Sequence, residues 1–117
     1  VTVAALNGTV AGGAFGMILA CDIRICVPSS KFFYPVMKMG YLPQPSDPKR
    51  LIDLIGPGRA KLMLVAGEKL DSCKAYEFGL VDEIVKVENL ISRAHTLLDA
   101  SLSARSDHIS GIKRLMN

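Results

Sequence analysis

The stretch NGTVAGGAFGMILACDIRI, residues 7–25, limits the folds open to this chain more than any other part of it. Its four glycines fall within residues 8–16, and an apolar run follows them at once. Because glycine adopts backbone angles that other residues avoid, the stretch predicts a tight turn that leads into a buried helix. No charged side chain precedes Asp22, so any chemistry performed by the glycine-rich part must come from its backbone.

Three functional interpretations of this backbone compete. A phosphate loop would end in Gly-Lys-Ser/Thr, whereas this stretch continues as Phe15-Gly16-Met17. A dinucleotide-binding turn needs GxGxxG spacing and an acidic residue about 20 positions later, and both are absent. The third is an oxyanion site, because a helix start offers free N–H groups and glycine lets a carbonyl oxygen approach them closely. The alternative is that Gly12 and Gly13 serve only tight packing before the helix.

Composition narrows the class of protein. The chain has 117 residues, half of them apolar, which fits one domain and predicts that some apolar surface meets another chain or a missing part of its own. The net charge of +3 comes from 14 basic and 11 acidic residues without a long basic run, so nucleic acid is not an expected partner.

Cysteine usage and hydropathy bear on the compartment. Cys21, Cys26 and Cys73 are odd in number and lack CxxC spacing, which argues against a disulfide framework or a zinc site. We expect buried, reduced thiols in a cytoplasmic protein. No signal-peptide pattern or membrane-length apolar run is visible, so no membrane partner is expected.

The element pattern predicts an α/β chain with a helical tail. Strands are expected at residues 1–6, 9–11, 22–27, 31–34 and 80–85, with a loop at 40–48. Helices are expected at residues 14–20, 48–55, 58–66, 72–78, 89–104 and from 107 onward.

Three segments together resemble the enoyl-CoA hydratase/isomerase, or crotonase, family: VAALNGTVAGGAFGMILACDIRI, KFFYPVMKMGYLP and RLIDLIGPGRAKLMLVAGEKLDSCKAYEFGLVDEIV. ACDIRI and the A-x-x-x-G-L-V-D pattern at residues 75–82 are its more specific signatures. The resemblance implies a superhelix of ββα turns with a helical C-terminal region. It also implies a fragment, with residues 1–86 as a partial core that lacks its N-terminal half. Residues 87–117 would be a helical trimerisation region, and the assembly a homotrimer or hexamer.

The resemblance also implies a site for an acyl-CoA thioester. In the family, two backbone N–H groups hold the thioester oxygen and stabilise an enolate. One donor corresponds to Gly13, and the other comes from an upstream segment that this chain lacks. Coenzyme A enters as part of the substrate, and neither a further cofactor nor a metal is implied. Besides Gly13, the implied substrate-binding residues are Gly12, Ala14, Tyr34, Pro35 and Gln44.

Two departures from the family pattern bear on the reaction. Hydratases of the family activate water with two glutamates, and the matching positions here are Gly16 and Val36. Since neither residue can exchange a proton, ordinary hydration is not expected. An isomerase, decarboxylase or hydrolase reaction is compatible with the remaining residues. The alternative is a catalytically inactive protein that keeps the fold and binds CoA or serves as a structural component.

The residues near the proline-rich loop carry open alternatives. Some relatives place an aspartate at the position of Gln44, and Asp47 would be a base if the loop folded inward. We expect Asp47 instead to cap the helix that begins at Pro48. Tyr34 and Tyr41 are expected to be half-buried packing residues with their hydroxyls at the surface, with contact to an acyl group or donation of a proton as the alternative.

The remaining candidates have a plain structural interpretation and a functional one. Met37 and Met39 are expected in the core, with an acyl pocket as the alternative. His95 and His108 lack ligand partners and are expected to be structural or exposed. Lys113 and Arg114 are expected on a solvated helix face, with CoA phosphates of a neighbouring subunit as the alternative.

Overall fold

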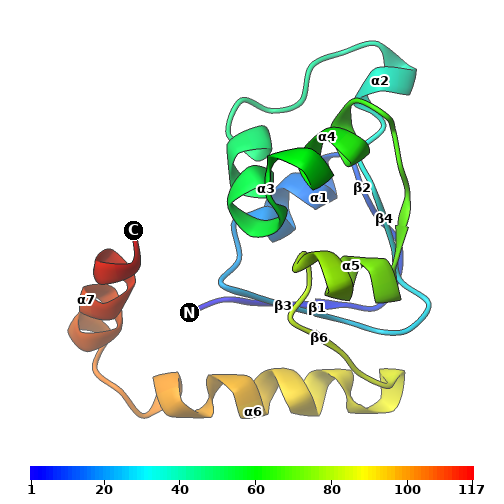
Figure 1. Cartoon of the computed structure of the whole chain (residues 1–117). Coiled ribbons are helices and arrows are strands. Elements are labelled where there is room, and N and C mark those ends of the chain that lie inside the picture. The colour runs from blue at the N-terminus through cyan, green and yellow to red at the C-terminus, as the bar shows by residue number, and fades with distance from the viewer.

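The computed structural model describes residues 1–117 (Figure 1). Its strands are β1 (Val3–Leu6), β2 (Val10–Ala11), β3 (Ile23–Cys26), β4 (Lys31–Phe33), β5 (Leu70–Asp71) and β6 (Glu83–Ile84). Its helices are α1 (Gly13–Leu19), α2 (Val36–Met39), α3 (Asp47–Ile55), α4 (Pro57–Leu64), α5 (Ser72–Phe78), α6 (Leu90–Leu102) and α7 (Ser106–Met116), with a 3₁₀ turn η1 (Val87–Asn89) before α6. Every expected strand and helix is present, most of them shorter than expected, and neither α2 nor β5 was predicted.

The strands follow a repeating ββα order. The first repeat is β1–β2–α1 and the second is β3–β4–α2. β1 pairs in parallel with β3, and β2 pairs in parallel with β4, so the second repeat stacks directly on the first. β6 extends the first sheet in parallel, whereas β5 joins the second sheet antiparallel to β4. This arrangement confirms the predicted ββα superhelix.

β3 is buried on both faces, which its alternating sequence did not indicate. Ile25 packs toward α6 and Cys26 toward the main core. Arg24 is only 3% exposed. Its guanidinium Nε donates to the Leu80 carbonyl at 2.8 Å, and Nη1 donates to the Cys21 carbonyl at 2.6 Å. These hydrogen bonds compensate the burial of a charged group in the sheet.

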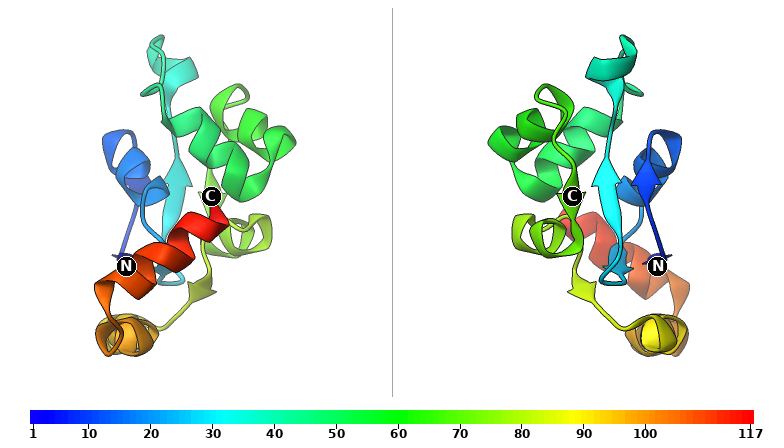
Figure 2. Two further views of the ribbon diagram at one scale, coloured as in Figure 1. Left: turned by 90° about the vertical axis from the view of Figure 1, so that its left-hand side faces the viewer. Right: turned by 90° about the vertical axis from the view of Figure 1, so that its right-hand side faces the viewer.

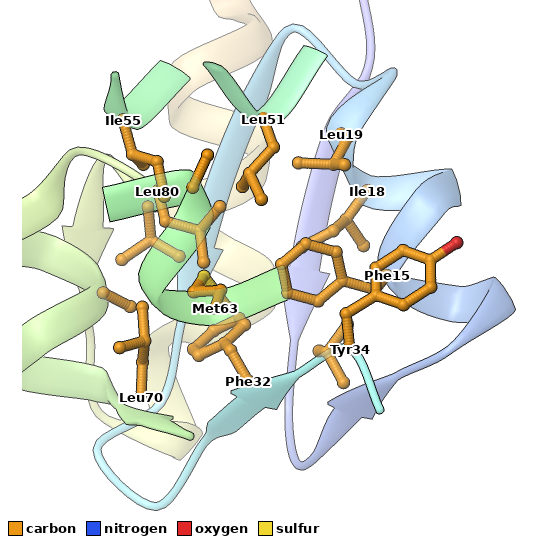
Figure 3. Close-up of a cluster of buried hydrophobic side chains, with 14 of the residues drawn as sticks. Phe15, Ile18, Leu19, Phe32, Tyr34, Leu51, Ile55, Met63, Leu70 and Leu80 are labelled. Atoms are coloured by element: carbon orange, nitrogen blue, oxygen red, sulfur yellow. The ribbon is translucent and has the colours of Figure 1, made fainter. Parts of the chain in front are cut away.

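The main core lies between the second sheet and helices α1, α3, α4 and α5 (Figure 3). Phe15 of α1, Phe32 of β4, Leu51 of α3 and Met63 of α4 are each at most 1% exposed. α5 also packs against this core, to which it contributes Ala75. Asp71 caps its N-terminus, because the Asp71 carboxylate accepts from the Lys74 backbone N–H at 2.8 Å. The core therefore fixes α1, β4 and α3 relative to one another.

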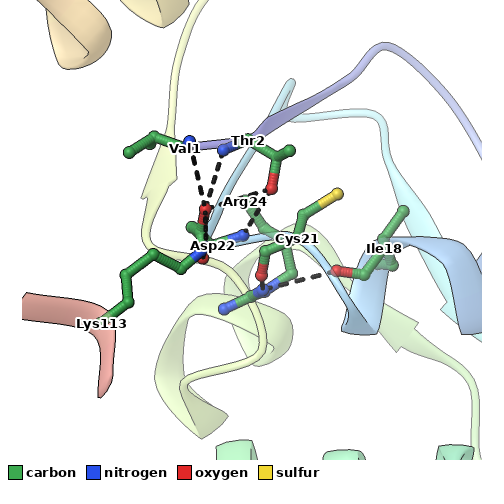
Figure 4. Close-up of polar contacts among 7 residues, drawn as sticks. All are labelled: Val1, Thr2, Ile18, Cys21, Asp22, Arg24 and Lys113. Carbon is green, nitrogen blue, oxygen red and sulfur yellow. Dashed lines mark hydrogen bonds and ion pairs between the residues drawn. The ribbon is translucent and has the colours of Figure 1, made fainter. Parts of the chain in front are cut away.

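The C-terminal region is helical, as predicted. α6 lies along the opposite face of the first sheet, where Leu90 packs with Ile25 and Val27 (Figure 1). α7 turns away from α6 and has no buried residue (Figure 2). One tie joins it to the body: Lys113 Nζ lies 2.9 Å from an Asp22 carboxylate oxygen (Figure 4). No helix is long and apolar enough to cross a membrane.

Candidate functional site

The glycine-rich turn opens α1 in a conformation that only glycine adopts readily. Gly12 has φ 58° and ψ −127°, and its carbonyl accepts from the amides of Phe15 at 3.0 Å and Gly16 at 3.3 Å. Gly13 is the first residue of α1, so no carbonyl lies one turn earlier within the helix to accept its N–H. Gly13 and Ala14 are both exposed. The turn therefore leaves the Gly13 N–H available to a ligand.

The register of β2 and β4 brings a second segment to this turn. Ala11 pairs with Phe33, so Gly12 and Tyr34 follow at the same edge of the sheet. The rings of Phe15 and Tyr34 lie with their centroids 5.5 Å apart (Figure 3). Pro35 continues the chain into α2. Most of the predicted binding residues, from both segments, are thus neighbours at one sheet edge.

Tyr34 is buried, and the prediction of a surface hydroxyl is wrong for it. Its side chain is 4% exposed, and its hydroxyl donates to Asp47 Oδ2 at 2.6 Å. The same hydroxyl accepts from the backbone N–H of Gln44 at 3.4 Å. Burial raises the pKa of Tyr34, and the adjacent Asp47 carboxylate raises it further. The phenol therefore remains a protonated donor. Tyr41, by contrast, is half exposed as expected.

Asp47 does not cap α3, so the capping prediction is wrong. Ser46 is the N-cap residue and makes no side-chain capping bond, while Asp47 is the first residue of the helix and is 4% exposed. Its carboxylate turns toward α1. A Cβ added to Gly16 would lie 2.6 Å from Oδ2 and 3.0 Å from Oδ1. The carboxylate of Asp47 therefore occupies the space that any side chain at position 16 would need.

Position 36, the second that departs from the family pattern, carries a buried apolar side chain. Val36 begins α2 and is 4% exposed. Its apolar side chain belongs to the main core with Tyr34. Neither Val36 nor Gly16 offers a group that exchanges protons. The ionisable side chains beside this part of α1 are the Asp47 carboxylate and the Tyr34 phenol.

A cavity of about 430 Å³ lies beside the same edge and shares Tyr34 and Pro35 with it. Met37 and Met39, 57% and 62% exposed, belong to its lining, so the prediction that they pack in the core is wrong. The short helix α2 carries them outward because its buried residue is Val36. The lining residues are Phe33, Tyr34, Pro35, Met37, Lys38, Met39, Gly67 and Lys69.

The other candidates lie away from this edge. His95 and His108 are exposed on α6 and α7, and no three His, Cys, Asp or Glu side chains gather as metal ligands would. Lys113 is paired with Asp22, while Arg114 is exposed.

The cysteines differ from the expectation of buried thiols. Only Cys26 is buried, while Cys21 is partly exposed and Cys73 is exposed. Burial raises the pKa of the Cys26 thiol to about 11, which keeps it protonated and unreactive.

The family model that describes enoyl-CoA hydratase/isomerase proteins matches residues 1–117. The chain belongs to the enoyl-CoA hydratase/isomerase family. A crotonyl-CoA hydratase of Syntrophomonas wolfei is 33% identical over 101 residues, which cover 86% of this chain and 39% of that protein. A carnitinyl-CoA dehydratase of Citrobacter koseri is 29% identical over 113 residues, which cover 97% of this chain and 43% of that protein.

The solved structures place the fold in the same family. DspI of Pseudomonas aeruginosa superimposes with a TM-score of 0.91 at 32% identity, over 97% of this chain and 47% of that one. This family member therefore spans about two fifths to one half of the length of the relatives that it matches.

Proposed function

We propose that this chain binds an acyl-CoA thioester and stabilises its enolate through the backbone N–H of Gly13. The observation that carries the proposal is that this N–H stands at an exposed turn and has no acceptor within α1. A preorganised donor aimed at a developing negative charge lowers the barrier by about 2.7–4 kcal/mol. The second donor would come from a segment outside this chain.

The names of the relatives support the substrate class. Both the crotonyl-CoA hydratase and the carnitinyl-CoA dehydratase are named for a CoA-linked substrate. The glycine-rich turn meets the chemical need of such a substrate, because it offers a hydrogen-bond donor without a side chain that would block a thioester. The proposal requires no cofactor besides the coenzyme A of the substrate itself.

The reaction class follows from the residues beside the turn. Hydration requires groups that donate and accept protons around a water molecule. Gly16 and Val36, at the positions of the two glutamates, supply none. We therefore propose a reaction in which negative charge develops on the thioester oxygen without the two-glutamate hydration machinery. A double-bond isomerisation or a decarboxylation would pass through an enolate, and a thioester hydrolysis would pass through a tetrahedral oxyanion.

A second candidate function is favoured by the same two residues. A protein that keeps the fold and binds CoA without chemistry would have no use for either glutamate.

We propose further that residues 87–117 mediate assembly into a homotrimer or hexamer. α7 supports this part, because Ile112, Leu115 and Met116 are exposed on it.

Exchange of the α-hydrogens of butyryl-CoA with deuterium oxide tests the proposed enolate directly. The complete protein, the Gly13→Pro variant and the Gly13→Ala variant would be compared by mass spectrometry of the recovered thioester. Proline removes the N–H but is tolerated at the first residue of a helix, and a Cβ at position 13 meets no atom within 4 Å. Alanine keeps the N–H and is the matched control.

We expect Gly13→Pro to slow exchange about 100- to 1,000-fold and Gly13→Ala to exchange at nearly the parental rate. Equal rates in both variants would overturn the role of the Gly13 N–H. No exchange by the parent protein, together with CoA binding in calorimetry, would overturn catalysis and leave the binding protein. Rapid hydration of crotonyl-CoA would overturn the proposed reaction class.

A further inference from the structure

We propose that Asp47 is the base that removes the proton from the α-carbon of the bound thioester, and that Tyr34 positions its carboxylate. The inference rests on the proposed function and names the acid–base group that this function lacks. The Asp47 carboxylate comes from α3 and lies beside Gly16 of α1. It therefore fills the space that a side chain at position 16 would otherwise occupy.

The carboxylate is held at one oxygen and free at the other. Oδ2 accepts the Tyr34 hydroxyl at 2.6 Å, a short hydrogen bond of the charge-assisted kind. Oδ1 accepts no hydrogen bond from another residue. Because no enclosed side-chain oxygen of the chain lacks a partner, Oδ1 must retain access to the surface. A buried carboxylate with one restrained and one accessible oxygen is suited to proton transfer in a fixed direction.

The position of the carboxylate matches that of the oxyanion donor. Gly13 and Gly16 are three residues apart in α1, so they lie on one face and about 5–6 Å from each other. The Gly13 N–H and the Asp47 carboxylate are thus about one helical turn apart. Two bonds separate the carbonyl oxygen of a thioester from its α-carbon. A thioester whose oxygen accepts from Gly13 can therefore place its α-carbon beside Asp47 when its acyl chain runs along α1 toward Gly16.

The proton transfer is balanced without any co-reactant. Asp47 takes the α-proton and becomes a carboxylic acid, while the C–H electron pair forms the enolate double bond and charge moves onto the thioester oxygen. The Gly13 N–H stabilises that oxygen. Return of the proton from Asp47 to the α-carbon completes an exchange, and its return to the γ-carbon of an extended enolate moves a double bond. Tyr34 remains protonated, because its pKa is raised, and keeps the carboxylate in place.

The Asp47→Asn variant tests the base with almost no change of shape, because asparagine can still accept from the Tyr34 hydroxyl. Asp53→Asn is the matched control, since Asp53 lies on the same helix with a side chain that is 63% exposed. Deuterium exchange into butyryl-CoA and the binding of CoA would be measured for both variants of the complete protein. We expect Asp47→Asn to slow exchange about 100- to 10,000-fold with little change in CoA binding, and Asp53→Asn to change neither.

Tyr34→Phe tests the positioning role. Phenylalanine fills the same space without the hydroxyl, so a packing role would survive the change. We expect a lower kcat for exchange with an unchanged KM. An unchanged kcat would remove Tyr34 from the proposal.

The outcomes separate this inference from the function on which it rests. If Gly13→Pro slows exchange and folded Asp47→Asn does not, the enolate stands and Asp47 is not its base. If the parent protein exchanges no deuterium, the proposed function itself fails. Should Asp47→Asn not fold, the double variant Asp47→Ala, Gly16→Glu returns a carboxylate to the same space from α1. Deuterium exchange catalysed by this double variant would support the inference. A folded double variant that catalyses no exchange would overturn it.

Discussion

The contact between Gly16 and Asp47 makes a sharp prediction about stability. Replacing a glycine inside a helix by alanine normally stabilises a protein by about 0.8–1 kcal/mol, because alanine has the higher helix propensity. At Gly16 the new Cβ would stand 2.6 Å from Asp47 Oδ2, 3.0 Å from Oδ1 and 3.1 Å from Cγ. The first of these separations is shorter than real Cβ contacts and the other two are tight, so the carboxylate must move. The side chain of aspartate is too short to move far while it keeps its bond to Tyr34.

The expected magnitude follows from the bond that is lost. A hydrogen bond to a charged group contributes about 1.5–3 kcal/mol. Subtracting the gain in helix propensity leaves a net loss of about 0.5–2 kcal/mol for Gly16→Ala. Gly111→Ala in α7 is the matched control, because a Cβ there meets no atom within 4 Å. It should stabilise the protein by up to about 1 kcal/mol.

Urea unfolding of the complete protein, followed by circular dichroism, measures both changes. In an Asp47→Ala background the clash is gone, so Gly16→Ala should become neutral or stabilising, and the double-mutant cycle should show coupling of about 1 kcal/mol or more. If Gly16→Ala stabilised the parent protein as Gly111→Ala does, the carboxylate would not stand beside Gly16. The reasoning about the base would then lose its foundation.

Three further predictions concern the frame around the site. Phe32→Ala should destabilise the protein by about 3–5 kcal/mol in urea unfolding, because the ring is fully buried. Burial raises the pKa of Asp22, but the hydrogen bonds from Lys113 and the Thr2 backbone N–H and the nearby positive charges together outweigh it, so the folded pKa lies below the ordinary 3.8. The stability difference between the parent and Asp22→Asn should therefore be complete above that value and shrink as the pH falls through the folded pKa, in unfolding curves at pH 7 and pH 3. Iodoacetamide at pH 8 should label exposed Cys73 well before Cys26, whose thiol reacts only on unfolding; equal labelling rates would contradict its burial.

Local sequence patterns predicted most of the fold. The glycine-rich turn, the strand at residues 22–27 and the capped helix at 72–78 each carry a signal within a few residues. The helix α2 was not predicted because its four residues, VMKM, are too few to show a helical period. The two-sided burial of β3 also has no local signal, since it depends on α6 and on the main core lying on opposite faces.

The candidate site was predicted only in part. The start of α1 and the segment at Tyr34 and Pro35 were expected to act together, and the parallel register of β2 and β4 makes them neighbours. The inward direction of the Asp47 side chain was the less favoured of two alternatives, because an aspartate before Pro48 has the ordinary signature of a helix cap. What turns it inward is the Tyr34 hydroxyl, 13 residues away in the chain. A signal was present in the bare Gly16, but its meaning depends on which element faces it.

A side chain at position 16 and the inward-facing carboxylate of Asp47 cannot occupy the same space. A glutamate at position 16 would require the space that the Asp47 carboxylate fills, since even a Cβ comes within 2.6 Å of it. A carboxylate supplied from α3 therefore demands a glycine at position 16. The same glycine that looks like a lost catalytic residue in the sequence is, in the fold, the condition for a carboxylate from another element to reach α1. The absence of a glutamate at position 16 and the burial of Asp47 have the same steric cause, so the two positions must be interpreted together.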